Sequence, residues 1–213
     1  KEGKINWDSK LIEVVPDLVG QIKAYYQDIR LQDLLSNRAK IQAFEDDGKA
    51  EWKKMPTTIQ NSDNSKFAFA KYALNLEPVA ITNDEHSYSN GGFVIAALML
   101  EFATGESWGN LVTKYNKAYG TNAFVGFPNQ ESLNGTYGHR KKRGKYKAVD
   151  PEEEYEFPFD FSPAGNLSLS LWDLSKIMQQ HLSGLLGQDN ILKSSTYHRL
   201  LFGLEDYALG WYN

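Results

Sequence analysis

The stretch YSNGGFVIAALMLEFATGESW (residues 88–108) contains the longest apolar run of the chain. It predicts a helix over residues 92–103, and because Glu101 is the only charge in that span, the helix should be buried nearly all round. Gly105 is expected to end this helix, and Ser107 to cap another helix directly after it. The stretch therefore predicts two consecutive helices, the first of them in the core.

Outside this stretch the sequence predicts short helices, one hairpin and several loops. The expected elements are a short helix ending near Tyr25, a short helix over residues 30–35, a helix over 66–74 capped by Ser65, a helix over 108–119, a hairpin over 137–149 and a final helix around 195–202. Residues 45–64, 120–135 and 150–163 have the composition of loops. Helices outnumber strands, so the predicted fold class is mainly α with a small β-hairpin.

A further helix, opened by Ser168 or Ser170, is strongly amphipathic. Its apolar residues recur at three- and four-residue steps, at Leu171, Leu174, Met178, Leu182 and Leu185. Polar residues of the same helix are expected elsewhere on the surface, at Asp173, Lys176 and Gln180.

The composition is that of a globular protein, either one domain or one lobe of a larger protein. The chain has 213 residues, of which 41% are hydrophobic, and a formal net charge of −4. This charge gives no overall attraction to nucleic acid or to an anionic membrane. There is no cysteine, which excludes disulfides, thiolate metal sites and a cysteine nucleophile. Residues 93–100 are too short an apolar run for a spanning helix, and the N-terminus lacks the features of a signal peptide. We expect the chain to be a piece of a longer protein.

Two motifs that suggest catalysis or metal binding are better explained in other ways. GESWG (residues 105–109) matches the G-x-S-x-G nucleophile elbow, but that motif needs a strand before the serine, and the segment before Ser107 is helical. Asp84, Glu85 and His86 are adjacent, so their side chains diverge, and no second histidine lies at ligand spacing. We therefore expect no metal and no cofactor.

The remaining histidines and the basic segment also have plain explanations. The other histidines, at His139, His181 and His198, are isolated in the sequence, and we expect His181 to be a packing or surface residue rather than a base. HRKKRGKYK (residues 139–147) is the only basic patch, and the acidic PEEE (residues 151–154) follows it closely. This pattern favours a solvated hairpin over a nucleic-acid site.

The most informative motif is HSYSNGGF (residues 86–93). If residues 88–90 are extended, Tyr88 and Asn90 leave the same face, and Asn90 could also cap the following helix. Gly91 and Gly92 remove Cβ atoms where a ligand or another part of a chain must come close. The alternative is that Tyr88 is a packed aromatic residue and Asn90 a plain helix cap.

Four segments in this order resemble the serine β-lactamase and penicillin-binding family, in its class C-like branch of D-alanyl-D-alanine carboxypeptidases and related esterases. EGKINWDSKLIEVVPDL (residues 2–18) resembles the segment after the family's nucleophile helix, and IRLQDLLSN (residues 29–37) its T-x-x-D-L-L-x-H element. YSNGGFVIAALMLEFATGESW resembles its Tyr-x-Asn motif with the following helix, and FSPAGNLSLSLWDLSKIMQQHLSG (residues 161–184) its P-A-G-G-L-x-S-T segment.

The resemblance implies roles for two residues. Tyr88 would accept the proton of a serine nucleophile and later donate it to the leaving group, and Asn90 would hydrogen-bond the substrate's acyl amide and a lysine. A phenol, with an ordinary pKa of about 10, can act as a base near neutrality only if cations stabilise the phenolate. In the family two lysines have this role, so Tyr88 without them should titrate near the ordinary value.

The sequence also departs from the family's pattern. It contains no Ser-x-x-Lys, no Lys-Ser/Thr-Gly and no His-x-Gly, so the nucleophile and the closing strand are expected outside the chain. The family's His-Thr-Ser-Gly after the D-L-L element is replaced by Asn37, Arg38, Ala39 and Lys40. Because a lysine stands where glycine is usual, no binding role is carried over to Lys40.

The resemblance therefore implies that residues 1–213 are a single helical lobe of a serine β-lactamase/DD-peptidase (α+β) fold whose α/β lobe lies outside the chain. The parent would hydrolyse a β-lactam, a D-Ala-D-Ala peptide or a small ester through an acyl-enzyme, and the chain alone would be inactive. Its expected partners are such a small-molecule or peptide substrate and the missing lobe, with no nucleic acid. Most relatives are exported, so a periplasmic or cell-envelope location is expected. The alternative is a non-catalytic binding or scaffold module that kept the helical lobe.

Overall fold

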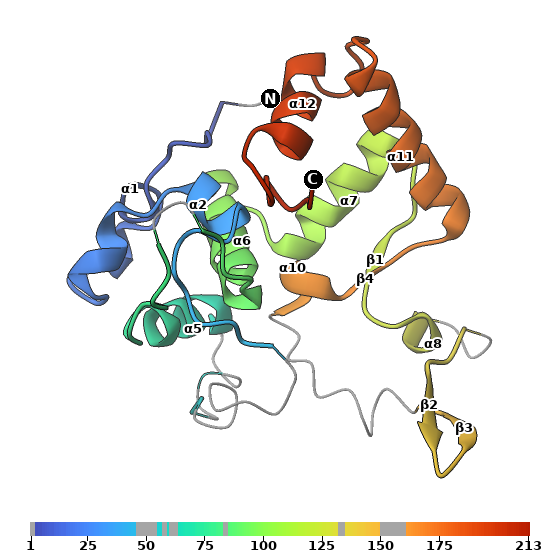
Figure 1. Cartoon of the computed structure of the whole chain (residues 1–213), viewed down its shortest axis with the longest axis horizontal. Helices are drawn as coiled ribbons and strands as arrows, with labels where there is room; N and C mark the ends of the chain where they lie inside the picture. The colour runs from blue at the N-terminus through green and yellow to red at the C-terminus, as the bar shows by residue number, and fades with distance from the viewer. Residues whose placement is uncertain are drawn as a thin grey trace.

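The computed structural model describes residues 3–45, 55–56, 59, 64–82, 85–131, 135–149 and 161–213 (Figure 1). The helices are α1 (Leu11–Val14), α2 (Leu31–Leu35), α5 (Ser65–Ala73), α6 (Asn90–Thr104), α7 (Trp108–Tyr119), α8 (Pro128–Glu131), α10 (Ser162–Gly165), α11 (Leu171–Leu185) and α12 (Ser194–Phe202), with 3-10 turns η1 (Pro16–Leu18) and η2 (Ala24–Asp28). The strands are β1 (Phe124–Val125), β2 (His139–Lys142), β3 (Lys145–Ala148) and β4 (Leu167–Ser168). The described part of the chain is mainly helical, as its sequence predicts.

Helix α6 lies at the centre of the core, as the apolar run predicts. It packs against α1, α2, α5 and α10, and its residues from Gly91 to Met99 are buried except Phe93. A Cβ atom on Gly92 would lie 3.2 Å from the Leu34 carbonyl oxygen of α2, and one on Gly91 would lie 2.9 Å from the Phe44 ring. The glycine pair therefore allows close approach of the chain's own α2 and Phe44.

The ends of α6 and α7 follow from local chemistry. Gly105 ends α6 in the left-handed conformation (φ 73°), which glycine adopts at little cost, and Ser107 caps α7 by accepting a hydrogen bond from the Asn110 amide at 3.3 Å. Both predictions are confirmed. Because a helix precedes Ser107, the nucleophile-elbow interpretation is excluded.

Two predicted caps are wrong by one residue. Asn64, not Ser65, caps α5, since its side chain accepts a hydrogen bond from the Phe67 amide. Ser89, not Asn90, caps α6, and its hydroxyl accepts a hydrogen bond from the Gly92 amide at 3.1 Å. In both places two adjacent residues have side chains able to cap a helix.

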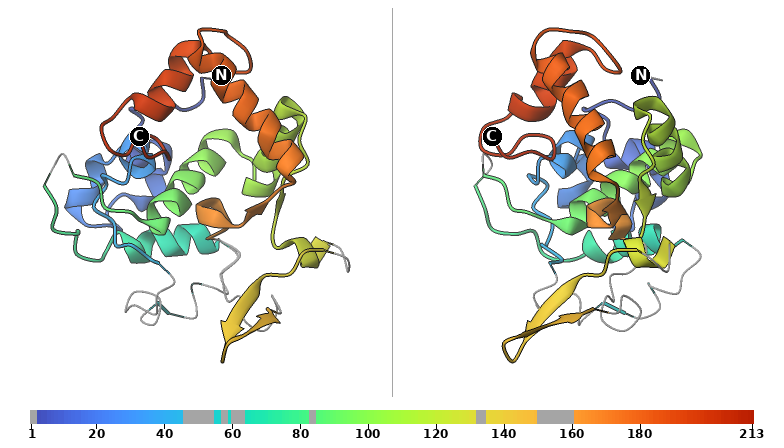
Figure 2. Two further views of the ribbon diagram at one scale, coloured as in Figure 1. Left: turned by 45° about the vertical axis from the view of Figure 1, so that its right-hand side comes forward. Right: turned by 90° about the vertical axis from the view of Figure 1, so that its right-hand side faces the viewer.

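The described strands form two small antiparallel pairs. β2 and β3 form the predicted hairpin around Gly144, which projects from the helical body (Figure 2). β1 pairs with β4, with Phe124 opposite Ser168 and Val125 opposite Leu167. Residues 120–135, which have the composition of a loop, also contain the short elements β1 and α8. Most of the predicted loops 45–64 and 150–163 lies outside the described residues.

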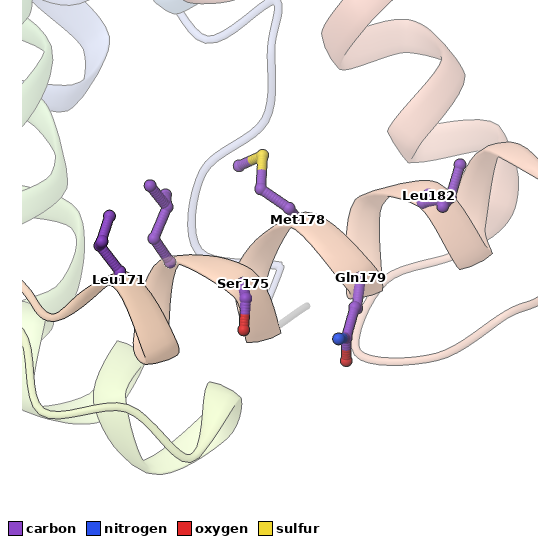
Figure 3. Close-up of a pocket in the computed structure, with 6 residues that line it drawn as sticks. Leu171, Ser175, Met178, Gln179 and Leu182 are labelled. Carbon is purple, nitrogen blue, oxygen red and sulfur yellow. The ribbon is translucent and has the colours of Figure 1, made fainter.

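The amphipathic helix α11 is capped by Ser170, one of the two predicted caps. Its apolar stripe lies largely in solvent: Leu171 is 85% exposed and Leu182 is 59% exposed. Figure 3 shows Leu171, Met178 and Leu182 projecting from one side of the helix. The buried side instead contains Ile177, Gly184 and Asp173.

Asp173 is buried, so the expectation that it lies on the surface is wrong. Its carboxylate accepts hydrogen bonds from Ser170 and from the Asn122 amide and forms an ion pair with Lys176 at 3.0 Å. These partners, Lys176 first, lower the pKa of the Asp173 carboxyl. The residue fastens the start of α11 to the loop after α7.

None of the helices in the described residues is long and apolar enough to cross a membrane.

Candidate active site

Asn37 holds the segment that carries Tyr88 in place. Its backbone carbonyl accepts a hydrogen bond from the Ser87 amide at 2.8 Å, and its side-chain oxygen accepts one from the Ser89 amide at 3.1 Å. Asn37 is buried and adopts a left-handed backbone (φ 58°), a conformation that asparagine tolerates better than most residues. The loop before α6 is thus fixed by one residue from the turn after α2.

Ser89 faces the interior. Its hydroxyl donates a hydrogen bond to the Gln42 carbonyl at 2.7 Å while capping α6, and the residue is 2% exposed. Ser89 has an extended backbone, whereas Asn90 is already the first helical residue. The two-residue alternation assumed from the sequence therefore stops at Ser89.

Asn90 is half-buried and is held by the loop that follows Lys40. Its side-chain Nδ2 donates a hydrogen bond to the Phe44 carbonyl at 2.9 Å, and its backbone amide donates one to the Ala43 carbonyl at 2.9 Å. Among the described residues, no group donates a hydrogen bond to the Asn90 Oδ1. The amide is therefore fixed through its nitrogen, and its oxygen can still accept an N–H from a substrate or a lysine.

Tyr88 is half-buried next to an aromatic cluster. His86 stacks on Tyr207 with ring centroids 5.2 Å apart, and Tyr207 meets Tyr212 edge-on at 4.8 Å. Burial raises the pKa of the Tyr88 hydroxyl, and the nearby charges of Glu45 and Tyr212 raise it further. The pKa of Tyr88 therefore lies above the ordinary value that the sequence led us to expect, and no cation is among the groups that shift it.

The same cluster perturbs Tyr207. Burial, followed by the nearby Tyr88, raises the pKa of Tyr207 to about 12. Two phenols next to each other disfavour ionisation of either one, since each phenolate would repel the other. In the described part of the chain, this region keeps Tyr88 protonated at neutral pH.

Arg38 attaches the C-terminal segment to this region, and the sequence did not identify it. Its guanidinium donates hydrogen bonds to the Tyr207 carbonyl at 2.7 Å, the Glu205 carbonyl at 2.9 Å and the Ser36 carbonyl at 3.2 Å. Its only sequence signal is its place in the substituted stretch after the D-L-L element. Arg38 thereby positions Tyr207 close to Tyr88.

Lys40, which stands where the family resemblance implies glycine, has a left-handed backbone with φ 56°. Its ammonium lies over the Tyr25 ring, 5.8 Å from the centroid, and its carbonyl accepts a hydrogen bond from the Val79 amide at 2.9 Å. The backbone shape that glycine would favour is therefore kept despite the lysine.

The histidines have structural contacts. His86 is a half-buried loop residue that stacks within the aromatic cluster, while Asp84 lies outside the described residues. His181 has its Nδ1 2.9 Å from the Ile177 carbonyl and packs on Tyr197 and Trp211, which fits the predicted packing role. Across the described ranges, no three His, Asp or Glu residues are grouped closely enough to hold a metal ion.

A large apolar groove of about 860 Å³ lies between the N-terminal segment, α6, α7, α11 and α12. Its wall is rich in aromatic side chains, including Trp7, Tyr115, Tyr119, His181 and Trp211. Neither Tyr88 nor Asn90 lines this groove.

One family model matches nearly the whole chain. The family model described as Beta-lactamase matches residues 1–211. Similar solved structures include FmtA from Staphylococcus aureus (18% identity, 99% of this chain and 55% of that chain, TM-score 0.69) and a D-stereospecific amidohydrolase from Streptomyces sp. (18%, 98% and 64%, 0.66). A class C β-lactamase mutant is also similar (15% identity, 93% and 49% coverage, TM-score 0.63). At these identities the likeness concerns the fold, and the chain spans about half the length of the first of these structures. A search of curated proteins gave no match.

Proposed function

The chain belongs to the Beta-lactamase family, and we propose that it is the helical part of a serine hydrolase that works through an acyl-enzyme. The observation that carries the proposal is the arrangement at the start of α6. Tyr88 precedes α6 on a segment that Asn37 holds in place. Asn90 is the first residue of α6, and its side-chain oxygen accepts no hydrogen bond from the described residues. A phenol and a carboxamide so placed suit proton transfer and binding of an acyl amide.

In the proposed reaction the nucleophilic serine comes from a part of the parent protein outside this chain. Its oxygen bonds to the acyl carbon of a β-lactam, a D-Ala-D-Ala peptide or a small ester, and the bond from that carbon to the leaving nitrogen or oxygen breaks. Tyr88 takes the serine proton and transfers it to the leaving atom. Water then hydrolyses the serine ester with Tyr88 again as the base. Asn90 would accept a hydrogen bond from the substrate amide or a lysine through Oδ1.

The fold and the electrostatics support a division of the site between two parts of one protein. The structural match with FmtA covers 99% of this chain but only 55% of FmtA. The aromatic groove between α6, α7, α11 and α12 offers an apolar surface on which the rest of such a protein could pack. The raised pKa of Tyr88 is consistent with the activating cations also coming from that part. On family grounds, the parent is proposed to be exported.

The test is acylation of the full-length parent by a fluorescent penicillin. The expected result is a covalent label on the intact protein and none on this chain alone. Tyr88→Phe should slow labelling by about 10²–10⁴-fold, the usual contribution of a general acid–base group. Tyr146→Phe, on the exposed hairpin, is the matched control and should label at the normal rate.

A second candidate is a non-catalytic binding module. The stretch Asn37, Arg38, Ala39 and Lys40 favours it, because the family's His-Thr-Ser-Gly is replaced there. In that case penicillin or a D-Ala-D-Ala peptide would bind reversibly, no covalent label would form, and Tyr88→Phe would leave binding unchanged.

A further inference from the structure

Four of the six basic residues of the hairpin lie on one of its faces, an arrangement that the sequence alone does not fix. The register of β2 and β3 places Arg140 opposite Lys147 and Lys142 opposite Lys145. Lys141 lies opposite Tyr146 on the other face, with its ammonium 5.9 Å from the ring centroid. All eight strand residues are exposed, and both figures of the whole chain show the hairpin projecting from the helical body (Figures 1 and 2). The result is an exposed cationic face on a hairpin that projects from the helical body (Figure 2).

This arrangement does not help the hairpin to fold. Like charges directly opposite each other on two antiparallel strands are destabilising, and Lys142 faces Lys145 in this way. Within the described ranges, no carboxylate forms an ion pair with Lys142, Lys145 or Lys147. The charges of these three lysines therefore remain available to a partner outside the described chain.

The charge of the whole chain is divided unevenly. Residues 139–147 contain six Lys and Arg and no Asp or Glu. Of the chain's 23 basic and 27 acidic residues, 17 basic and 27 acidic residues remain elsewhere, a charge of −10 against +6 on the hairpin. An anionic partner would attract the hairpin and repel the rest of the protein, so contact is directed to the projecting end.

We propose that Lys142, Lys145 and Lys147, on the cationic face that they share with Arg140, dock the protein on the surface of a bilayer that contains anionic phospholipid. A bilayer surface can reach these charges because the hairpin projects from the helical body (Figures 1 and 2). A nucleic acid would bring its phosphates along more of the protein, where the net charge is −10. The cationic face also has no aromatic residue on which a base could stack, because Tyr146 belongs to the other face. Clusters of four to eight Lys and Arg beside a membrane-spanning helix or on an amphipathic helix bind anionic lipid, and residues 139–147 contain six.

The acidic segment that follows the hairpin should weaken this contact. Glu152, Glu153 and Glu154 are close to the hairpin in sequence and lie outside the described residues. Replacing all three with glutamine should strengthen bilayer binding, because it removes repulsion without changing the cationic face.

Vesicle co-sedimentation tests the proposal with the full chain. Vesicles of phosphatidylcholine with about 30% phosphatidylglycerol should bind the protein, and binding should fall steeply as salt rises from about 0.05 to 0.5 M. The triple variant K142Q/K145Q/K147Q should bind roughly 100-fold more weakly, at roughly fivefold for each charge removed. Tyr146→Ala, from the opposite face, should bind like the unchanged protein. Since all these residues are exposed, the variants should keep the normal circular dichroism and melting temperature.

Three results would overturn the proposal. The first is equal binding to vesicles of phosphatidylcholine alone, which would show that charge is not the cause. The second is unchanged binding of the triple variant. The third is tighter binding to a 20-base-pair DNA duplex than to the anionic vesicles at the same salt, which would assign the face to nucleic acid.

Discussion

Gly92→Ala is the most direct test of how α6 is positioned. In an open helix the added methyl stabilises by up to about 1 kcal/mol, because alanine has the higher helix propensity. At Gly92, however, the new Cβ would lie 3.2 Å from the Leu34 carbonyl oxygen of α2, a backbone atom that cannot move by a rotamer change. Overpacking of this kind costs about 1–3 kcal/mol, so we expect a net loss of roughly 0–2 kcal/mol in the free energy of unfolding.

Gly109→Ala supplies the matched control. Gly109 lies in the first turn of α7, and nothing lies within 4 Å of the position that its Cβ would take. The same substitution there should stabilise the protein by about 0.5–1 kcal/mol. Urea unfolding of the two variants and the unchanged protein, followed by circular dichroism, measures both effects, and the two values should have opposite signs.

The comparison also has a functional readout. Gly92 lies two residues after Asn90, so a shift of α6 away from α2 would also move the amide that Phe44 holds. In the full-length parent, Gly92→Ala should therefore slow acylation by a penicillin, while Gly109→Ala should not. If Gly92→Ala stabilises the protein as much as Gly109→Ala, the close packing of α6 against the Leu34 carbonyl is refuted.

Two further predictions concern the aromatic cluster beside Tyr88. Arg38→Ala removes three hydrogen bonds to carbonyl groups, so it should lower the free energy of unfolding by about 1.5–3 kcal/mol. It should also speed amide exchange in residues 205–212. An unchanged exchange rate would contradict the anchoring role. The pKa of Tyr207 is raised to about 12 in the folded protein, so the unfolded chain loses this proton at a lower pH. The free energy of unfolding should therefore fall as the pH rises from about 10 to 12, by roughly 2–3 kcal/mol at the upper end. Tyr207→Phe should flatten that part of the stability curve, and an equally steep fall in the variant would assign it to other groups.

The parts of the fold that the sequence predicted are those set by neighbouring residues. An apolar run, a left-handed Gly105 and a capping Ser107 all act within one helical turn, and α6 and α7 begin and end close to where they were expected. Where two capping residues stand side by side, as at Ser89 and Asn90, the choice depends on which residue leaves the helical conformation first. That choice is made by Asn37 and Gln42, which bind Ser89 from far away in the sequence.

The parts that were missed depend on contacts between distant segments. Periodicity identified the apolar stripe of α11 but not which face the rest of the chain covers, and the covered face contains Asp173 and Gly184. A Cβ on Gly184 would overlap the Tyr197 ring, so a small residue, rather than the leucines, fixes the contact between α11 and α12. β1 has only two residues and pairs with a segment more than 40 residues later, which leaves little local signal.

The two residues of the candidate site were chosen from the sequence, but their supports were not. Asn37 appeared only as a departure from the family's pattern, and its function depends on a left-handed backbone together with hydrogen bonds to Ser87 and Ser89. Arg38 acts on carbonyl groups some 167–169 residues away in the chain. Residue spacing and composition do not reveal the roles of Asn37 and Arg38, because both roles depend on distant segments of the chain packing against the turn after α2.

The electrostatics of Tyr88 set a requirement for the proposed chemistry. Its pKa lies above the ordinary value of about 10, so to be half ionised at pH 7 it must fall by at least about 3 units, or roughly 4 kcal/mol in favour of the phenolate. An ammonium about 4 Å away contributes roughly 4 kcal/mol at an effective dielectric constant of 20. One such cation would bring only a phenol of ordinary pKa to half ionisation at pH 7, and burial and the charge of Glu45 raise the pKa of Tyr88 further. More than one cation, or a cation together with hydrogen-bond donors to the phenolate, is therefore needed to make Tyr88 an effective base at neutral pH.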